Sequence, residues 1–491
     1  MKVYLAIFGL VTLFTMNSTS DCMAAGLEFG PYGVGFDTYK AYDDSRLYVL
    51  GEDSVSRPLL IHFWYPFQKT GESQALKFKD YIDLIAQRED FGRSRSEIDN
   101  HSFYYIKGYS DFAKSNFGLD TSISAKFILE SPVRANSSII NTDPKTKFPL
   151  LIYAPSNSKA SVQNHLLCEY LASHGFMILS VASAGPNSIV RESFTESTMA
   201  QVTDMEYILK FCEDSLKIKY ESLGLFGFSS GGNAITIFQM RNKNVEAVLS
   251  LDGGQEYSTF IGLYSMQDFD LEKANVPYLS LVNNYKDFSI YPMYNSIKST
   301  EKYICRMPYL NHNGFISYWL YFSSCSPNTI KNNSIISFEY LSECALRFFS
   351  KYLKHETKKS DNNFSDELTN KYIQSFKQDY SSINTLCKTL LNNDLDSASS
   401  LVELHKEELF GGANQVNILA RMFSDNELAV WLYQKSVEYQ PDSWESYYDL
   451  GYYYKEKSEI LQATKALLEA KKLSPENTKV TELLIELEKM E

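Results

Sequence analysis

A short glycine-rich run constrains the fold of this chain more than any other part of its sequence. It reads GFSSGG from Gly227 to Gly232, after an apolar stretch and before a helix-forming one. A buried strand, a serine flanked by glycines and then a helix is the order of a nucleophile elbow, a strained turn that exposes the serine hydroxyl. Gly227 stands two residues before Ser229, whereas the bulky Phe228 stands two before Ser230. We therefore predict an elbow with Ser229 as the nucleophile; the alternative is an ordinary glycine-rich loop.

Apolar runs and helix-like stretches alternate between residues 58 and 307. Most of the runs are continuously apolar, as expected for strands that are covered on both faces. The repeated order of strand, helix and strand indicates a parallel sheet. The predicted fold class is therefore α/β, with a mostly parallel sheet and helices on both faces. The predicted strands are Leu59–Tyr65, Pro149–Tyr153, Phe176–Val181, Ser222–Phe226, Glu246–Leu251, Tyr278–Val282 and Lys302–Arg306. The predicted helices are Val162–His174, Thr198–Ser215, Gly232–Arg241 and Phe338–His355, of which the last closes the domain.

The C-terminal region differs from the rest of the chain in charge. The 491 residues carry a net charge of −13, and the segment from Asp361 to Glu491 holds 23 Asp and Glu against 13 Lys and Arg. An acidic chain is a poor partner for nucleic acid, and the shift in charge marks a domain boundary. We predict a signal peptide at 1–25, an α/β domain at 26–356 with an insertion or cap at 68–147, a polar linker at 357–366 and helical repeats at 367–491.

The first residues have the pattern of an export signal. Lys2 precedes the apolar run Val3–Phe14, a polar stretch follows, and the small residues from Ala24 to Gly26 offer a cleavage region. The apolar run is too short to span a bilayer comfortably. We expect the mature protein to be exported to the periplasm or the extracellular space, with an uncleaved anchor as the alternative.

The C-terminal region also carries the spacing of a 34-residue helical repeat. Around Trp444 the pattern runs through Gly451, Ala463 and Pro475, and a second copy stands 34 residues earlier. Small residues recur where paired helices touch, and proline recurs where the second helix ends. We predict tetratricopeptide-like repeats, with 383–408 as a degenerate earlier repeat and 480–489 as a capping helix; an unrelated helical bundle is the alternative. Such arrays present concave surfaces to peptides or partner domains.

A serine hydroxyl needs a base to activate it, and the base needs a carboxylate to orient it. Of the seven histidines, only His312 lies just after the last predicted strand, where the base stands in the usual chain order, because His355 and His405 lie in or beyond the closing helix. The Asn and Gly residues around it indicate a loop. Two carboxylates follow strands, Asp252 after residues 246–251 and Asp287 after residues 278–282. Spacing alone does not choose between these two acids.

Two backbone N–H groups are needed to hold the negative charge that develops on an attacked carbonyl oxygen. One is expected from Ser230, the residue after the nucleophile. The other is expected from the loop that follows the strand at 149–153. Because Pro155 has no N–H, Asn157 is the predicted donor, with Ser156 second.

Six cysteines follow the predicted signal, and their spacing contains no zinc-binding pattern, so no metal is expected. An exported chain allows disulfides, and a bridge between Cys305 and Cys325 would pin the segment that holds His312. Scattered buried thiols are the equal alternative. The six are Cys168, Cys212, Cys305, Cys325, Cys344 and Cys387.

Besides the elbow and the segments that hold the acid and the base, several short segments match the sequence pattern of a known family. They are GPYGVGF at 30–36, DSR at 44–46, RP at 57–58, WYP at 64–66, FPL at 148–150 and LASHGF at 171–176. Together they resemble the plasma-type platelet-activating-factor acetylhydrolases and their bacterial dienelactone-hydrolase-like relatives. The likeness covers about residues 30–355. The helical repeats resemble C-terminal extensions on some exported bacterial hydrolases.

The resemblance implies an α/β-hydrolase fold with a Ser–Asp–His triad. In that family the acid stands in a Leu-Asp context about two dozen residues after the serine. Asp252 stands 23 residues after Ser229, so the resemblance favours Asp252 over Asp287. The family's histidine precedes a phenylalanine by three residues, as His312 does here.

We therefore expect an exported serine hydrolase that cleaves a short-chain or lipid-like carboxylic ester through an acyl-enzyme on Ser229, without a metal or organic cofactor. A thioester or amide hydrolase, or an acyltransferase, would use the same triad. An inert hydrolase body that serves repeat-based binding is the other alternative. The resembled family usually has His-Gly where this chain has Pro155-Ser156, and this difference favours the hypothesis of an inert hydrolase body. The expected partners are the ester and, through the repeats, a protein or peptide.

Overall fold

The computed structural model describes most of the chain from residue 27 onward. The predicted signal at 1–25 and the predicted linker at 357–366 lie outside the described residues. The described ranges are 27–69, 74–117, 125–137, 147–156, 161–182, 185–187, 193–257, 259–283, 291–299, 301–307, 309–323, 328–354, 386, 389–390, 394–410, 415–423 and 427–490.

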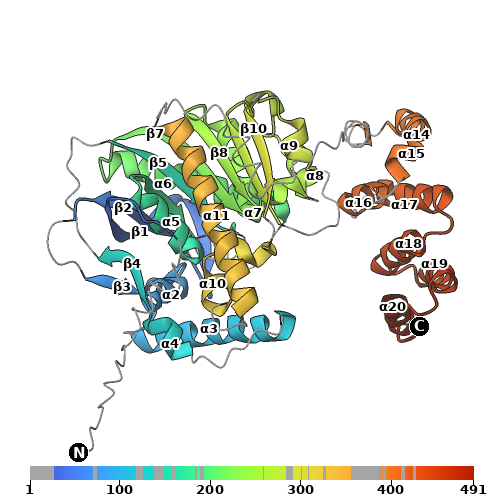
Figure 1. Ribbon diagram of the computed structural model, residues 1–491, viewed down its shortest axis with the longest axis horizontal. Helices are drawn as coiled ribbons and strands as arrows, with labels where there is room; N and C mark the ends of the chain where they lie inside the picture. The colour runs from blue at the N-terminus through green and yellow to red at the C-terminus, as the bar shows by residue number, and fades with distance from the viewer. Residues whose placement is uncertain are drawn as a thin grey trace, which may run out of the picture.

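The first part of the chain is built on a mixed sheet with the strand order β10-β9-β8-β7-β5-β6-β2-β1-β4-β3 (Figure 1). The strands from β10 to β6 in this order are parallel to their neighbours, and β2 runs antiparallel to β6 and to β1. All seven predicted strands are present, which confirms the α/β fold class with a mostly parallel sheet. The strands are β1 (Gly33–Leu50), β2 (Asp53–Phe67), β3 (Ala75–Lys77), β4 (Pro132–Ser137), β5 (Phe148–Ala154), β6 (Met177–Val181), β7 (Tyr220–Phe228), β8 (Val245–Leu251), β9 (Tyr278–Val282) and β10 (Lys302–Arg306).

The strand β1 is one that the hydrophobic pattern does not predict. Every second residue from Thr38 to Asp44 is exposed, so charged side chains interrupt its apolar sequence. It pairs with β2 along almost its whole length. Gly51 begins the two-residue turn between them with φ +64°, a backbone conformation that glycine adopts at little cost.

Helices cover both faces of the sheet. Because neighbouring side chains on a strand point to opposite faces, Leu150 and Ile152 of β5 pack in one apolar layer and Leu151 and Tyr153 in the other. The first layer includes α6 (Phe194–Asp214) and α7 (Ser230–Arg241). The second includes α5 (His165–Ser173) and α11 (Asn328–Leu353), which crosses the sheet in Figure 1. The four predicted helices correspond to these elements.

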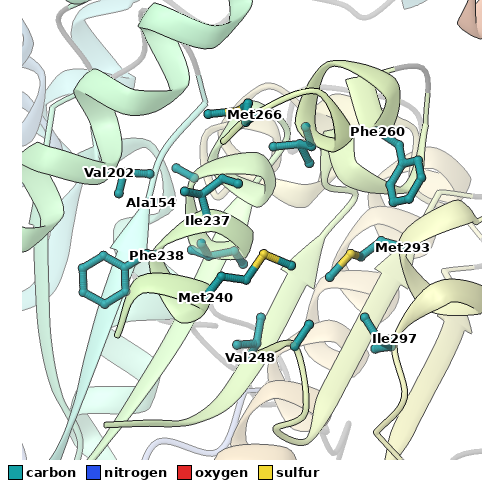
Figure 2. Close-up of a cluster of buried hydrophobic side chains, with 14 of the residues drawn as sticks. Ala154, Val202, Ile237, Phe238, Met240, Val248, Phe260, Met266, Met293 and Ile297 are labelled. Atoms are coloured by element: carbon teal, nitrogen blue, oxygen red, sulfur yellow. The ribbon is translucent and has the colours of Figure 1, made fainter. Parts of the chain in front are cut away.

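The layer around α7 contains several methionines. Figure 2 shows Met240 of α7 and Met293 of α9 (Pro292–Ser296) pointing toward one another, with Met266 and Phe260 beyond them. All four side chains are buried. Flexible thioether side chains fill irregular gaps well, and here they pack around the helix that begins directly after the predicted nucleophile.

The predicted insertion at 68–147 extends the sheet and adds helices beside it. Its described elements are β3, α2 (Phe78–Gln87), α3 (Arg95–Phe117), α4 (Ala125–Glu130) and β4, and β4 pairs with β1. A buried chain of hydrogen bonds joins this segment to α5. Trp64 Nε1 donates to Tyr81 Oη at 2.8 Å, and Tyr81 donates to Glu169 Oε1 at 2.8 Å. The backbone N–H groups of Arg134 and Ala135 in β4 also donate to Glu169.

The C-terminal region is helical among the residues that the structure describes. The predicted repeat around Trp444 forms the antiparallel pair of α18 and α19, and an ideal Cβ at Gly451 would lie 2.7 Å from Leu467 Cγ, so a small residue is needed where these helices meet. The helix α16 contacts α8 (Thr259–Tyr264) of the first domain. The helices are α14 (Leu395–Leu404), α15 (Lys406–Phe410), α16 (Gln415–Met422), α17 (Glu427–Tyr439), α18 (Trp444–Glu456), α19 (Ile460–Leu473) and α20 (Thr478–Glu488). Within the described ranges, the search for a helix long and apolar enough to cross a membrane finds none.

Candidate active site

The predicted elbow is a sharp turn between β7 and α7. Ser229 joins the strand to the helix with φ 55° and ψ −121°, a backbone conformation that residues other than glycine rarely adopt. Backbone hydrogen bonds hold it there. Its N–H donates to the Leu251 carbonyl at 3.2 Å, and its carbonyl accepts from Gly232 at 2.9 Å and Gly254 at 2.8 Å. The strain at Ser229 is therefore supported by the following helix and by the next loop of the sheet.

The glycines around Ser229 are required by close backbone contacts. An ideal Cβ at Gly227 would lie 2.5 Å from the Gly231 carbonyl oxygen, and one at Gly231 would lie 2.0 Å from the Ala154 carbonyl oxygen. The start of α7 therefore touches the end of β5. This contact places the nucleophile beside the loop from which the second oxyanion donor is predicted.

Ser229, His312 and Asp252 form a continuous row of hydrogen bonds. His312 Nε2 lies 3.0 Å from Ser229 Oγ, and His312 Nδ1 lies 2.6 Å from Asp252 Oδ2. Asp252 follows β8 directly, is 1% exposed and has φ 46°. The structure thus brings together the three residues predicted as nucleophile, base and favoured acid. The alternative acid, Asp287, lies outside the described residues.

Two neighbours that no sequence pattern indicates hold the Asp252 carboxylate. The Tyr257 hydroxyl donates to Oδ1 at 2.5 Å. The Asn283 backbone N–H donates to Oδ1 at 3.0 Å, and its Nδ2 donates to Oδ2 at 2.9 Å. Burial and the nearby Asp252 charge raise the pKa of the Tyr257 phenol far above its usual value, so it stays a donor. Asn283 stands directly after β9.

His312 begins the short 3-10 helix η4 (His312–Phe315). The Asn311 side chain caps this turn by accepting from the Gly314 N–H at 3.0 Å, a typical use of Asn at a helix start. The ring of Phe228 lies 4.9 Å from the imidazole ring. The imidazole is 43% exposed, so a substrate and water can reach the predicted base.

Two further histidines are deeply buried and therefore unsuited to proton transfer with a substrate. His62 and His165 are fully buried, and burial lowers the pKa of each to about 3. His62 Nδ1 is hydrogen-bonded to Ser161 Oγ, and His165 Nε2 lies 3.0 Å from the Tyr321 hydroxyl. Both imidazoles therefore stay neutral and hold structure.

Half of the predicted oxyanion hole is described. Ser230 is the first residue of α7, so its backbone N–H stands at a helix start, beside Ser229. Asn157, the predicted second donor, lies outside the described residues. The start of its loop is fixed, because the Pro155 carbonyl accepts from Gln201 Nε2 at 2.7 Å. Ser156, the second candidate, is 8% exposed.

The described residues contain no group of three or more His, Cys, Asp or Glu side chains that could hold a metal ion. Cys168, Cys212, Cys305 and Cys344 are buried free thiols, and burial raises the pKa of each. Such thiols are poor nucleophiles and metal ligands. Cys325, the proposed partner of Cys305, lies outside the described residues.

The comparisons with known proteins give a similar solved structure and a matching family model. The solved structure of a ferulic acid esterase from Streptomyces cinnamoneus is similar at 15% sequence identity and a TM-score of 0.45, over 66% of this chain and 91% of that one. The search of curated proteins finds no match. A family model described as tetratricopeptide repeat matches residues 432–465. This match falls on α17, α18 and the start of α19, and it confirms the repeat predicted around Trp444.

Proposed function

We propose that this chain is a serine hydrolase that cleaves a carboxylic ester through an acyl-enzyme on Ser229. The observation that carries the proposal is the hydrogen-bonded row from Ser229 through His312 to Asp252, which begins at a strained elbow. A nucleophile, a base within hydrogen-bond reach and a third group that orients the base are the parts that acyl transfer requires. The finer identity, a relative of platelet-activating-factor acetylhydrolases, is part of this proposal.

The proposed reaction has two half-reactions. His312 Nε2 takes the proton from Ser229 Oγ as the oxygen bonds to the ester carbonyl carbon, and Asp252 holds the Nδ1–H that keeps the imidazole in the required tautomer. The backbone N–H groups of Ser230 and Asn157 would stabilise the oxyanion. The tetrahedral intermediate then expels the alcohol, which takes its proton from His312. Water, deprotonated by His312, attacks the acyl-enzyme, and the acid leaves as Ser229 recovers its proton.

The substrate class rests on the sequence resemblance, which suggests a short-chain or lipid-like acyl group. Export to the periplasm or the extracellular space is proposed from the first 25 residues alone. The tetratricopeptide match suggests that the C-terminal helices bind a protein or peptide, because such repeats present concave surfaces to partners. The repeats would then place the esterase near that partner.

Labelling with a fluorophosphonate probe tests the proposal directly. The purified full-length protein should be labelled, and Ser229→Ala should lose the label. Asp252→Asn should slow labelling more than Asp287→Asn if Asp252 is the acid. A correctly folded wild-type protein that takes no label and hydrolyses no p-nitrophenyl ester would contradict the proposal and favour the inert, repeat-based alternative.

A further inference from the structure

The segment directly before α5 and the segment that carries His312 are joined through one buried side chain, Asn164. This residue ends the short 3-10 helix η1 (Ser161–Asn164) and is the residue directly before α5. It is fully buried. Its partners lie about 150 residues away in the sequence, beyond the base.

Asn164 stands at a helix cap but does not cap its own helix. An Asn at this position ordinarily accepts from a backbone N–H in the first turn of the helix, and here its side chain makes no such bond. The Leu166 N–H donates instead to Ser317 Oγ at 3.1 Å. Ser317 comes from the histidine loop, and its hydroxyl donates to Asn164 Oδ1 at 3.1 Å. Ser317 thus caps α5, and Asn164 in turn binds Ser317.

The amide nitrogen of Asn164 binds the segment that carries the predicted base. Asn164 Nδ2 donates to the Phe315 carbonyl at 3.2 Å in a buried contact. Phe315 ends the four-residue turn η4 that His312 begins. Asn311 caps the first end of this turn, and Asn164 fixes its last end. The turn that bears the imidazole is therefore held at both ends, by Asn311 directly before it and by Asn164 of η1.

The helix η1 is itself anchored to two other parts of the fold. Its first residue, Ser161, is hydrogen-bonded to His62 Nδ1 in β2. Gln163 Nε2 donates to the Tyr105 hydroxyl of α3 at 2.7 Å. Because η1 is hydrogen-bonded to the sheet and to the insertion, the position of Asn164 is fixed, and Asn164 can in turn hold η4.

We propose that Asn164 is a positioning residue that sets where His312 stands relative to Ser229. The inference rests on the proposed function. Asn164 touches neither reacting atom, and it acts by binding the Phe315 carbonyl and by accepting from Ser317. Asn164 does not cap its own helix but makes long-range contacts instead. Such departures from local preference occur where function constrains a fold. Without the contact, the last end of η4 is free to move, and a displacement of about 1 Å at a catalytic group can cost on the order of 100-fold in rate.

The first test compares Asn164→Ala and Ser317→Ala with a matched control. Ser222→Ala removes a hydroxyl that is equally buried and donates to the Leu353 carbonyl at 2.8 Å, near the end of β7 away from Ser229. We expect kcat for p-nitrophenyl acetate to fall roughly 10- to 100-fold in both site variants with KM within about threefold. The control should keep wild-type kcat while losing a similar amount of thermal stability. Equal kcat values in all three variants would overturn the proposal.

The second test asks whether Asn164 acts through His312. Asn164→Ala is introduced into a His312→Ala background, and the residual rate that the remaining site supports is measured. The effect of Asn164→Ala should vanish in this background, because the group that it positions is gone. The same fold loss in both backgrounds would show that Asn164 acts elsewhere and would overturn the inference, while an active wild type would leave the proposed function standing. A wild type without Ser229 labelling would overturn both.

A spectroscopic measurement supplies a readout without turnover. The proton between His312 Nδ1 and Asp252, which lie 2.6 Å apart, should give a downfield proton resonance that disappears in Asp252→Asn. That resonance should shift or broaden in Asn164→Ala and stay unchanged in Ser222→Ala. An unchanged resonance in Asn164→Ala would count against a positioning role.

Discussion

Tyr257 and Asp252 stand five residues apart, and the Tyr257 hydroxyl donates a 2.5 Å hydrogen bond to Asp252 Oδ1. The other carboxylate oxygen, Oδ2, faces His312. A buried carboxylate that orients an imidazole must itself be held, because each hydrogen bond lost from it leaves charge desolvated. The phenol therefore fixes the rotation of the carboxylate, so that Oδ2, which also accepts from Asn283 Nδ2, faces His312.

Tyr257→Phe should lower kcat for p-nitrophenyl acetate roughly 10- to 100-fold, since a hydrogen bond to a charged group contributes about 1.5–3 kcal/mol. Steady-state kinetics at fixed pH measure the effect. Tyr207→Phe is the matched control, because it also removes a donating hydroxyl, the one bonded to the Tyr42 carbonyl. Its kcat should match wild type. A Tyr257→Phe variant with full kcat would remove the phenol from the support of Asp252.

Much of the row of Ser229, His312 and Asp252 could be predicted from the sequence. Chain order and spacing mark the serine and the histidine, whereas they leave two acids open and the family resemblance favours Asp252. Ser229 is flanked by glycines after a strand, Asp252 follows the next strand, and His312 follows the last one. The repeat around Trp444 was equally accessible, because small residues recur at a fixed period.

The supporting residues could not be predicted in the same way. Tyr257, Asn283 and Asn164 act through hydrogen bonds to distant or folded-back loops, and no local pattern records such a contact. Asn164 stands at a helix N-cap, where local preference predicts that it accepts from a backbone N–H of its own helix. The strand β1 escaped prediction for another reason, because its exposed face is charged and its pattern is not continuously apolar.

Gly231→Ala should destabilise the protein and abolish labelling of Ser229. The added Cβ would lie 2.0 Å from the Ala154 carbonyl oxygen, so α7 or β5 must shift, and overpacking of this kind typically costs about 1–3 kcal/mol or more. Gly108→Ala in α3 is the control, because nothing lies within 4 Å of its ideal Cβ. It should be neutral or stabilising by about 0.5–1 kcal/mol. Thermal unfolding and fluorophosphonate labelling of both variants give the comparison.

Glu169 should make stability depend on pH. Burial raises the pKa of Glu169 from 4.5 to about 7, although hydrogen bonds from Tyr81 and from the β4 backbone oppose the shift. A raised carboxyl pKa means that the folded state binds the proton more tightly than the unfolded chain does. Its stabilising contribution is therefore complete below about pH 4.5 and is lost as the pH rises through about 7. The full contribution is on the order of 3 kcal/mol.

Urea unfolding of wild type and Glu169→Gln between pH 5 and pH 8 measures this dependence. The free energy of unfolding of wild type minus that of Glu169→Gln should fall as the pH rises. The difference is the relevant quantity, because Glu256, whose pKa burial also raises to about 7, contributes to both proteins alike. A difference that is constant across this range would show that Glu169 titrates as an ordinary carboxyl.

Arg57→Met should destabilise the protein by about 3–5 kcal/mol, because it leaves a buried carboxylate without its main partner. Arg57 is 1% exposed and forms a two-point contact with Asp204, from Nε to Oδ1 at 2.7 Å and from the second guanidinium nitrogen to Oδ2 at 2.5 Å. Its remaining nitrogen donates to the Pro186 carbonyl at 2.7 Å. The exposed pair of Lys472 and Glu469 supplies the control.

Lys472→Met should change the free energy of unfolding by less than about 1 kcal/mol, since solvent already screens that pair. Arg57→Lys should recover little of the loss in Arg57→Met, because an ammonium cannot match both carboxylate oxygens and the carbonyl at once. Equilibrium urea unfolding of the three variants ranks them. If Arg57→Lys restored wild-type stability, charge alone would explain the pair; a persistent loss would show that the planar guanidinium holds the hairpin end of β2 to α6.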